Sequence, residues 1–282
     1  MSRIKRGWEL TKKSWGVLRA NRSLVRFPLY GGVAMIPATI LVLGPGLYLI
    51  EDGKVAPGAP LVVLGLYLLA FIGFYFSVGL AACADKIFRG EQASVADGMA
   101  VARSRVGSIA GWAALATTVG VVLNVLAEEG GVFGSIVGRL LSVGWSLITF
   151  LAVPVIAFEG TSAFTTLKRS STLFRERWGQ QITGNIAIGG AVALFGILPS
   201  ALLVGAGVLL WSTSGFGGAL LVIVGVIGIA ISALISQALS GIFGVALYRY
   251  ATEGAAVGGF TADDMESAVR RKKGAGPEPA TI

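Results

Sequence analysis

The sequence predicts an all-α fold, a polytopic membrane bundle of six transmembrane helices in three hairpins, joined by amphipathic cytoplasmic helices. Six long apolar stretches run through the 282 residues, and 54% of the residues are hydrophobic whereas only 13% are charged. Soluble domains carry about 25% charged residues. Of the 23 Lys and Arg residues, only Lys54 and Arg139 fall on one side of the expected spans. This asymmetry is typical of multi-pass membrane proteins, whose cytoplasmic loops hold the basic residues.

A bilayer core about 30 Å thick requires roughly 20 apolar residues per helix. The expected spans are residues 27–50, 61–83, 106–126, 136–158, 182–211 and 218–250. The connections at residues 51–60, 127–135 and 212–217 are short, so they pair the spans into three hairpins. The remaining connections are longer and basic, which predicts that both termini are cytoplasmic.

Three parts of the chain follow from these spans. Residues 1–26 are expected to form an amphipathic cytoplasmic helix. Residues 27–253 form the six-helix transmembrane domain with two cytoplasmic connecting helices, and residues 254–282 form a cytoplasmic C-terminal helix and tail.

The first amphipathic helix carries an apolar stripe at helical spacing, made of Ile4, Trp8, Thr11, Trp15 and Leu18. Lys12 and Lys13 mostly face away from the stripe. A face with Trp opposite a face with Lys suits the headgroup layer of a membrane. Trp8, Trp15, Lys12 and Lys13 are therefore candidate membrane-interface residues. The alternative is that the stripe packs on the protein itself, and the pattern does not decide between the two.

A second stripe of this kind lies in the third cytoplasmic segment, where Phe164, Leu167, Phe174 and Trp178 recur at helical spacing. Lys168, Arg169, Arg175 and Arg177 surround it. Trp178 is a further candidate for the membrane interface, and packing on the protein is again the alternative.

The cytoplasmic segments resemble one another, which indicates an internal repeat. Residues 96–105 align with residues 262–271, and five of these ten positions are identical. Gly90, Gly160 and Gly254 each follow an even-numbered span, where the next cytoplasmic segment begins. The predicted unit is an amphipathic helix followed by a membrane hairpin.

The last span holds small residues four positions apart, namely Gly228, Ser232, Ser236, Ser240 and Gly244. Small residues let helix backbones approach closely in a membrane, so the stripe is a candidate packing seam. The alternative is a polar pore lining that includes Gln237.

The composition excludes several kinds of site. The chain has no His and a single Cys, Cys83, so no disulfide can form within it and no Cys/His metal cluster can assemble. Acid–base chemistry by His is also excluded, and we expect no catalytic residues and no cofactor. No Asp, Glu, Lys or Arg lies near the middle of a span, which argues against proton coupling. The net charge of +8 fits membrane orientation and anionic lipid headgroups rather than nucleic acid, for which the chain has no basic soluble domain.

Two stretches resemble a known family. Residues 90–97 read Gly-Glu-Gln-Ala-Ser-Val-Ala-Asp, with Trp112 downstream, and residues 168–180 read Lys-Arg-Ser-Ser-Thr-Leu-Phe-Arg-Glu-Arg-Trp-Gly-Gln, followed by Gly184 and Asn185. They are similar to an uncharacterised family of bacterial and archaeal six-helix membrane proteins, a domain of unknown function. The resemblance implies a prokaryotic cell membrane as the location, and it implies no activity.

Two functions are compatible with these observations. The first is a non-enzymatic membrane scaffold or accessory protein, which acts through its basic interfacial helices on lipids, on a membrane protein partner or on a second copy of itself. The second is a channel or facilitator for small solutes, lined by the Ser-rich last helix. The amphipathic helices favour the first function, and the stripe of Ser residues favours the second.

Overall fold

The fold is taken from a computed structural model, which describes residues 3–129, 137–138, 141–142, 144–146, 148–178, 196–211 and 214–262. The side chains of residues 3–10, 22, 129, 177 and 178 are outside this description. Within it the chain is helical, with no strand. The helices are α1 (Arg3–Ala20), α2 (Arg22–Ala38), η1 (Thr39–Leu43), α3 (Gly44–Glu51), α4 (Val55–Phe88), α5 (Val95–Ser104), α6 (Val106–Glu129), α8 (Ala152–Glu159), α9 (Ala163–Trp178), α11 (Leu198–Leu210) and α12 (Gly215–Glu253).

Four of the described helices are long and apolar enough to cross a membrane: Ser23–Glu51, Val55–Phe88, Val106–Glu128 and Gly215–Glu253. Leu198–Leu210 is a shorter apolar helix. The expected spans at 136–158 and 182–211 fall partly outside the described residues, so six spans in three hairpins stays a prediction. The predicted turn at 51–60 was too long, because only Asp52, Gly53 and Lys54 separate α3 from α4.

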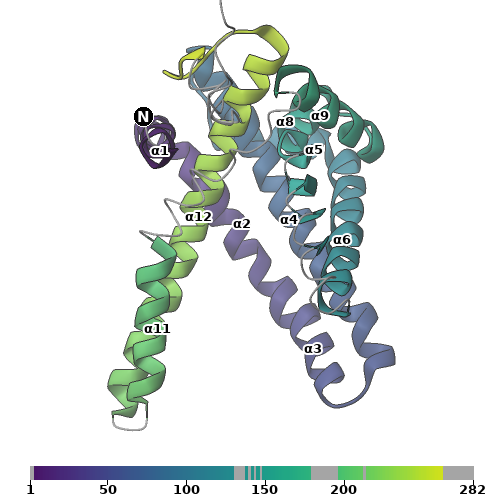
Figure 1. The fold of residues 1–282 in the computed structure, drawn as a ribbon, viewed down its shortest axis with the longest axis vertical. Helices are drawn as coiled ribbons and strands as arrows, with labels where there is room; N and C mark the ends of the chain where they lie inside the picture. The colour runs from purple at the N-terminus through teal and green to yellow at the C-terminus, as the bar shows by residue number, and fades with distance from the viewer. Residues whose placement is uncertain are drawn as a thin grey trace, which may run out of the picture.

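Two legs diverge from a common end of the molecule (Figure 1). One leg holds α2, α3 and α4, and the other is the hairpin of α11 and α12. Helices α1, α5, α8 and α9 gather with the last turns of α12 at the common end, which we call the head end. The start of α1 and the end of α12 therefore lie at the same end of the molecule.

The buried core lies towards the head end. In α4 most buried residues fall between Val78 and Asp85, and in α12 most fall between Ala238 and Ala251. The 39 residues of α12 extend about 58 Å at 1.5 Å per residue, roughly twice the thickness of a bilayer core. The longest helices thus continue beyond the length of a single membrane span, and the charged side chains of α4 and α12 are near their head-end termini.

Glycines hold each described hairpin together. A Cβ on Gly65 of α4 would lie 2.9 Å from the Cα of Leu43, and one on Gly225 of α12 would lie 2.6 Å from the carbonyl oxygen of Ser200. Atoms do not approach so closely, so only glycine allows these backbones to touch. Close backbone contact of this kind is how helices associate in membranes, where the hydrophobic effect between helices is weak.

The first leg contains one π-helical turn, η1. The N–H of Gly44 bonds to the carbonyl oxygen of Thr39, five residues earlier. Pro45 follows directly, and a proline ring clashes with the carbonyl four residues before it, here that of Leu41. Widening of the turn relieves this clash, and the helix continues as α3.

The glycines that mark the predicted repeat share one backbone conformation. Gly90, Gly160 and Gly254 have φ angles of 80°, 64° and 72°, and they follow the ends of α4, α8 and α12. A residue in this left-handed region ends a helix, and glycine adopts it without steric cost. These three helices therefore end at the head end with a glycine in the same left-handed conformation. The predicted fourth cytoplasmic helix at 262–271 falls outside the described residues apart from residue 262.

Candidate functional site

An ion pair joins α4 to α12 at the head end. Nε and one terminal nitrogen of Arg249 lie 2.6 and 2.5 Å from Oδ1 of Asp85. Arg89, one turn after Asp85, donates to the second carboxylate oxygen at 2.8 Å. Arg249 also bonds to Glu253, one turn further along α12. The side chain of Asp85 is only 6% exposed, so its charge is neutralised by two guanidinium groups instead of by water.

A second group of charges lies beside this ion pair. Nε of Arg169 in α9 donates to both carboxylate oxygens of Glu159, at 2.9 and 3.2 Å. The hydroxyl of Tyr248 in α12 donates to Glu159 at 3.0 Å. The hydrogen bond to Glu159 holds the pKa of Arg169 above its ordinary value. Phe158 links the two groups, because its ring lies 5.7 Å from the Arg249 guanidinium carbon and 5.2 Å from the Tyr248 ring.

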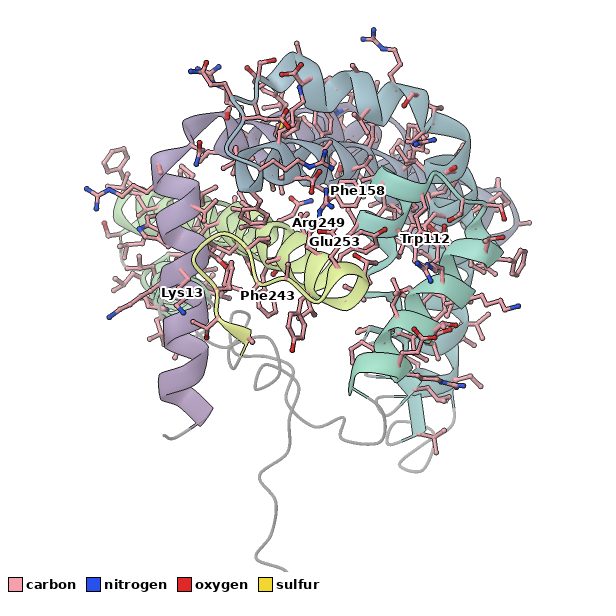
Figure 2. All side chains as sticks on the ribbon, turned by 90° about the horizontal axis from the view of Figure 1, so that it is seen from above. Lys13, Trp112, Phe158, Phe243, Arg249 and Glu253 are labelled. Carbon is pink, nitrogen blue, oxygen red and sulfur yellow. The ribbon has the colours of Figure 1, made fainter. Side chains whose placement is uncertain are left out.

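These side chains surround an open hollow of about 430 Å³. We call it the charged hollow; it is lined by Arg89, Ala157, Phe158, Arg169, Tyr248, Arg249, Thr252 and Glu253. Figure 2, a view from the head end, shows Arg249, Glu253 and Phe158 close together near the centre of the molecule. Three guanidinium groups and a single carboxylate line the wall, whereas Asp85 and Glu159 stand behind it.

The pairing of these charges was not predicted from the sequence. Asp85 lies five residues before Gly90, and Arg249 lies five residues before Gly254. The two charges thus occupy equivalent positions relative to the glycines of the repeat, and they are opposite in sign. This shared position is the signal that could have predicted the pair.

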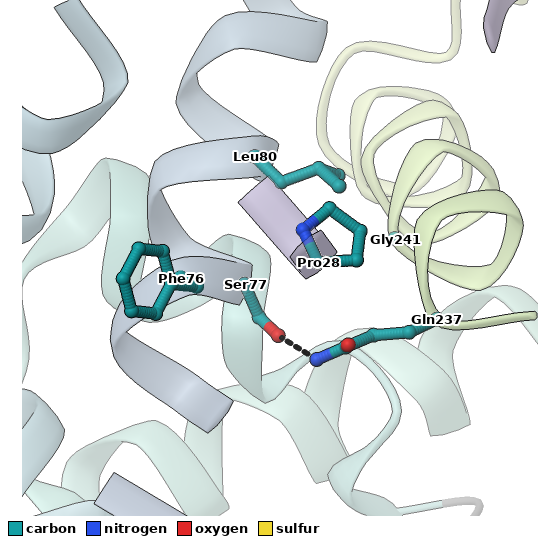
Figure 3. A pocket seen from close by; sticks show the side chains of 6 residues that line it. All are labelled: Pro28, Phe76, Ser77, Leu80, Gln237 and Gly241. Carbon is teal, nitrogen blue, oxygen red and sulfur yellow. Dashed lines mark hydrogen bonds between the residues drawn. The ribbon is translucent and has the colours of Figure 1, made fainter. Parts of the chain in front are cut away.

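A second polar contact lies between α4 and α12, farther from the head end. Nε2 of Gln237 donates to Oγ of Ser77 at 3.2 Å, and Ser77 donates to the carbonyl oxygen of Gly73 in its own helix at 2.7 Å. Pro28, Phe76, Leu80 and Gly241 surround this contact (Figure 3). The space beside it is about 10 Å³, which is room for about one water molecule. In this arrangement Gln237 bonds to the neighbouring helix.

The stripe on α12 does not face one neighbour along its length. Gly228 lies directly against the Ser200 side chain of α11, and buried Ser232 donates to the carbonyl oxygen of Gly228. At the other end, a Cβ on Gly244 would lie 3.8 Å from the Phe150 ring. Ser236 and Ser240 are half-buried. Residues four apart drift by about 40° around a helix with 3.6 residues per turn, so the stripe winds from α11 towards Phe150. The backbones of α11 and α12 approach each other closely at Gly207, Gly218 and Gly225, which lie outside the predicted stripe.

The candidate membrane-interface residues of α1 divide between two faces. Thr11, Ser14 and Leu18 are buried against the protein, whereas Trp15 is 45% exposed. Lys12 lies three residues before Trp15, and Arg19 lies four residues after it. Both are exposed, and this spacing places them on the same face of the helix as Trp15. Lys13 is half-buried. The side chain of Trp8 lies outside the described residues.

The stripe predicted on α9 is likewise divided. Thr166, Ser170, Leu173 and Phe174 are buried, and Ser170 donates to the carbonyl oxygen of Ile148. Phe164, expected on the same face as Phe174, is 75% exposed. The buried face of α9 therefore includes polar residues. Thr166 and Ser170 can be buried because their hydroxyl groups donate to backbone carbonyl oxygens. The side chain of Trp178 lies outside the described residues.

Among the described residues, neither the lone thiol nor the acidic side chains provide a metal site. Cys83 is buried, and its Sγ donates to the carbonyl oxygen of Ser94 at 3.0 Å. In the part of the chain that the structure describes, no group of three or more Cys, Asp or Glu side chains could hold a metal ion.

A family of unknown function, DUF6159, matches residues 58–259. The chain belongs to this family. The match includes the two motifs noted in the sequence. In the first motif, Ser94 and Asp97 cap the start of α5, and Trp112 is buried against the ring of Trp145. The second motif begins in α9 and includes Arg169, which lines the charged hollow. Asp85, Glu159, Arg169 and Arg249 also lie within the matched region of DUF6159. No curated protein and no solved structure matches the chain.

Proposed function

We propose that this member of DUF6159 is a non-enzymatic, six-span protein of a prokaryotic cell membrane, with its head end and both termini in the cytoplasm. It acts there as a scaffold or accessory protein, through basic helices that lie in the anionic headgroup layer. A partner membrane protein or a second copy of the chain would be gathered at this surface.

One observation carries the proposal. Two head-end helices each expose an aromatic ring on the same face as exposed cations. In α1 the ring is that of Trp15, beside Lys12 and Arg19; in α9 it is that of Phe164, with Lys168 and Arg175 one and three turns along the helix, both exposed. Aromatic rings enter the boundary between headgroups and acyl chains while nearby cations attract anionic lipids. The opposite faces of both helices pack on the protein, which supports a fixed depth for the rings.

The channel remains an alternative prediction. Farther from the head end than the charged hollow, Gln237 of α12 bonds to Ser77 of α4, and the space beside this contact holds about one water molecule. This closed arrangement does not favour a solute path, so we put the scaffold first.

The test uses the full chain with a fluorescent reporter beside Trp15. Gly16 is exposed, and a Cβ there meets no atom within 4 Å, so Gly16→Cys in a Cys83→Ser background offers a labelling site on α1. We expect an environment-sensitive dye there to shift to the blue in nanodiscs with phosphatidylglycerol, compared with phosphatidylcholine. High salt should reduce the shift, because salt screens attraction at the surface.

Adding Lys12→Gln and Arg19→Gln should reduce the same shift, whereas Arg103→Gln, at an exposed residue of α5, should leave it intact. If the dye emission is the same in both kinds of nanodisc, the head end does not bind anionic lipid, and this part of the proposed function is wrong.

A further inference from the structure

We propose that the charged hollow binds a phosphate group. The hollow lies between α4, α9 and α12, and guanidinium groups from all three helices line it: Arg89, Arg169 and Arg249. The hydroxyl-bearing residues Tyr248 and Thr252 complete the polar part of the wall. Convergence of guanidinium groups with hydroxyl groups is the chemistry that recognises phosphate oxygens.

The two more exposed guanidinium groups, those of Arg89 and Arg169, are each oriented by a carboxylate outside the hollow. Arg89 uses one terminal nitrogen for Asp85, and Arg169 uses Nε for Glu159. A guanidinium carries five N–H donors in a fixed fork, so each keeps donors for a second acceptor. Their side chains are 55% and 41% exposed, whereas the carboxylates that orient them are 6% and 24% exposed. The acidic residues thus fix the direction of the cations without filling the hollow.

The free N–H donors on the wall favour an anion. The lining residues carry three positive charges and the negative charge of Glu253, and Asp85 and Glu159 balance the other two positive charges from outside the hollow. Glu253 bonds to Arg249, so it competes with any anion on that side of the hollow. A phosphate group would lie nearer to Arg89 and Arg169 and would be opposed by Glu253. The arrangement therefore predicts opposite effects for neutralising Arg169 and neutralising Glu253.

The phosphate has two possible sources, which share this chemistry: an anionic lipid headgroup, or a soluble phosphate. A volume of about 430 Å³ accommodates either of them. For the lipid source, the inference rests on the proposed function, because it requires the head end to lie in the headgroup layer. For the soluble source it does not.

The experiment measures binding to the purified full chain in an uncharged detergent by isothermal calorimetry. The probes are inorganic phosphate and dihexanoyl phosphatidylglycerol below its micelle concentration. Arg169→Gln and Arg89→Gln should each weaken binding by about tenfold or more, since a hydrogen bond between charged groups contributes about 1.5–3 kcal/mol. Glu253→Gln should strengthen binding several-fold. Arg175→Gln, an exposed arginine on the same helix as Arg169, is the matched control and should leave the affinity unchanged.

The pattern across the probes separates the sources. Binding of the lipid alone identifies a headgroup site, binding of phosphate alone identifies a soluble ligand, and sensitivity of both probes to Arg169→Gln identifies a site for either. Failure of both probes to bind overturns the inference, as does binding that Arg89→Gln and Arg169→Gln leave unchanged. Thermal unfolding without ligand verifies that each variant is folded. The dye shift on α1 should persist in Arg169→Gln, so this inference and the proposed function can fail independently.

Discussion

The carboxylate of Asp85 lies 2.6 Å from Nε of Arg249, although 164 positions separate the two residues in the chain. This pair joins the two legs of the molecule at the head end. The contact of Gln237 with Ser77 lies farther along the same two helices, and the legs then diverge (Figure 1). Arg249 is 15% exposed and Asp85 6%, so water contributes little to balancing either charge. The pair therefore holds α12 against α4 and also forms the back wall of the charged hollow.

Breaking this pair should destabilise the fold strongly. Arg249→Gln leaves the Asp85 carboxylate with Arg89 alone, and removing one partner of a buried pair costs about 3–5 kcal/mol. Because Arg249 is partly exposed, we expect about 3 kcal/mol in the free energy of unfolding, measured in mixed detergent micelles. Adding Asp85→Asn should recover part of the loss, since the unpaired charge is then removed.

A matched control is the pair of Lys54 and Asp52, whose atoms lie 2.7 Å apart but whose side chains are 61% and 46% exposed. Lys54→Gln should cost less than about 1 kcal/mol, as is usual for surface pairs. Similar small losses for Arg249→Gln and Lys54→Gln would show that the buried pair does not join the two legs.

The glycines of the α11–α12 hairpin should differ in their tolerance of a methyl group. In Gly225→Ala the new Cβ would lie 2.6 Å from the carbonyl oxygen of Ser200, a backbone atom that cannot turn aside. We expect a loss of about 1–3 kcal/mol, the cost of overpacking. In Gly205→Ala the new Cβ meets no atom within 4 Å, so stability should stay the same or rise by up to about 1 kcal/mol through helix propensity. Thermal unfolding of both variants in detergent measures this difference. Equal effects of the two substitutions would contradict a close backbone contact between α11 and α12 at Gly225.

The cap of α5 should make stability depend on pH. The backbone N–H of Ser94, its hydroxyl and Lys86 lower the pKa of Asp97 to about 2. The unfolded value is about 4, so Asp97 stabilises the folded state above pH 4 and loses this contribution as the pH falls from 4 towards 2. The loss of melting temperature between pH 6 and pH 3 should be smaller in Asp97→Asn than in the unchanged protein. Glu91→Gln, an exposed neighbour, is the control and should behave as the unchanged protein does.

The proposed orientation can be tested with single cysteines in a Cys83→Ser background. Lys54 lies in the exposed turn between α3 and α4, and Arg103 is exposed on α5 at the head end. In intact cells, a thiol reagent that does not cross membranes should label Lys54→Cys and should reach Arg103→Cys only after lysis. Labelling of Arg103→Cys from outside would reverse the orientation.

Much of the helical frame could be predicted from local properties of the chain. Spans long enough to cross a bilayer are runs of apolar residues, and both ends of four described spans lie within six residues of the predicted bounds. Gly90, Gly160 and Gly254 were also recognised as helix ends, because the left-handed backbone that stops a helix selects glycine. Length, hydrophobicity and glycine position are each a property of one segment, so no knowledge of its neighbours was needed.

Tertiary structure decided which faces meet. Thr11 and Leu18 of the predicted stripe on α1 are buried while Trp15 projects outwards, and Phe174 of α9 is buried while Phe164 is exposed. The stripe from Gly228 to Gly244 was predicted as one surface, but a spacing of four drifts around the helix and meets two different neighbours. In the sequence, Asp85 and Arg249 are each a single charge five residues before a glycine that ends a helix. Their pairing, and the hollow beside it, arise from the packing of helices far apart in the sequence, and no pattern within a single helix carries that information.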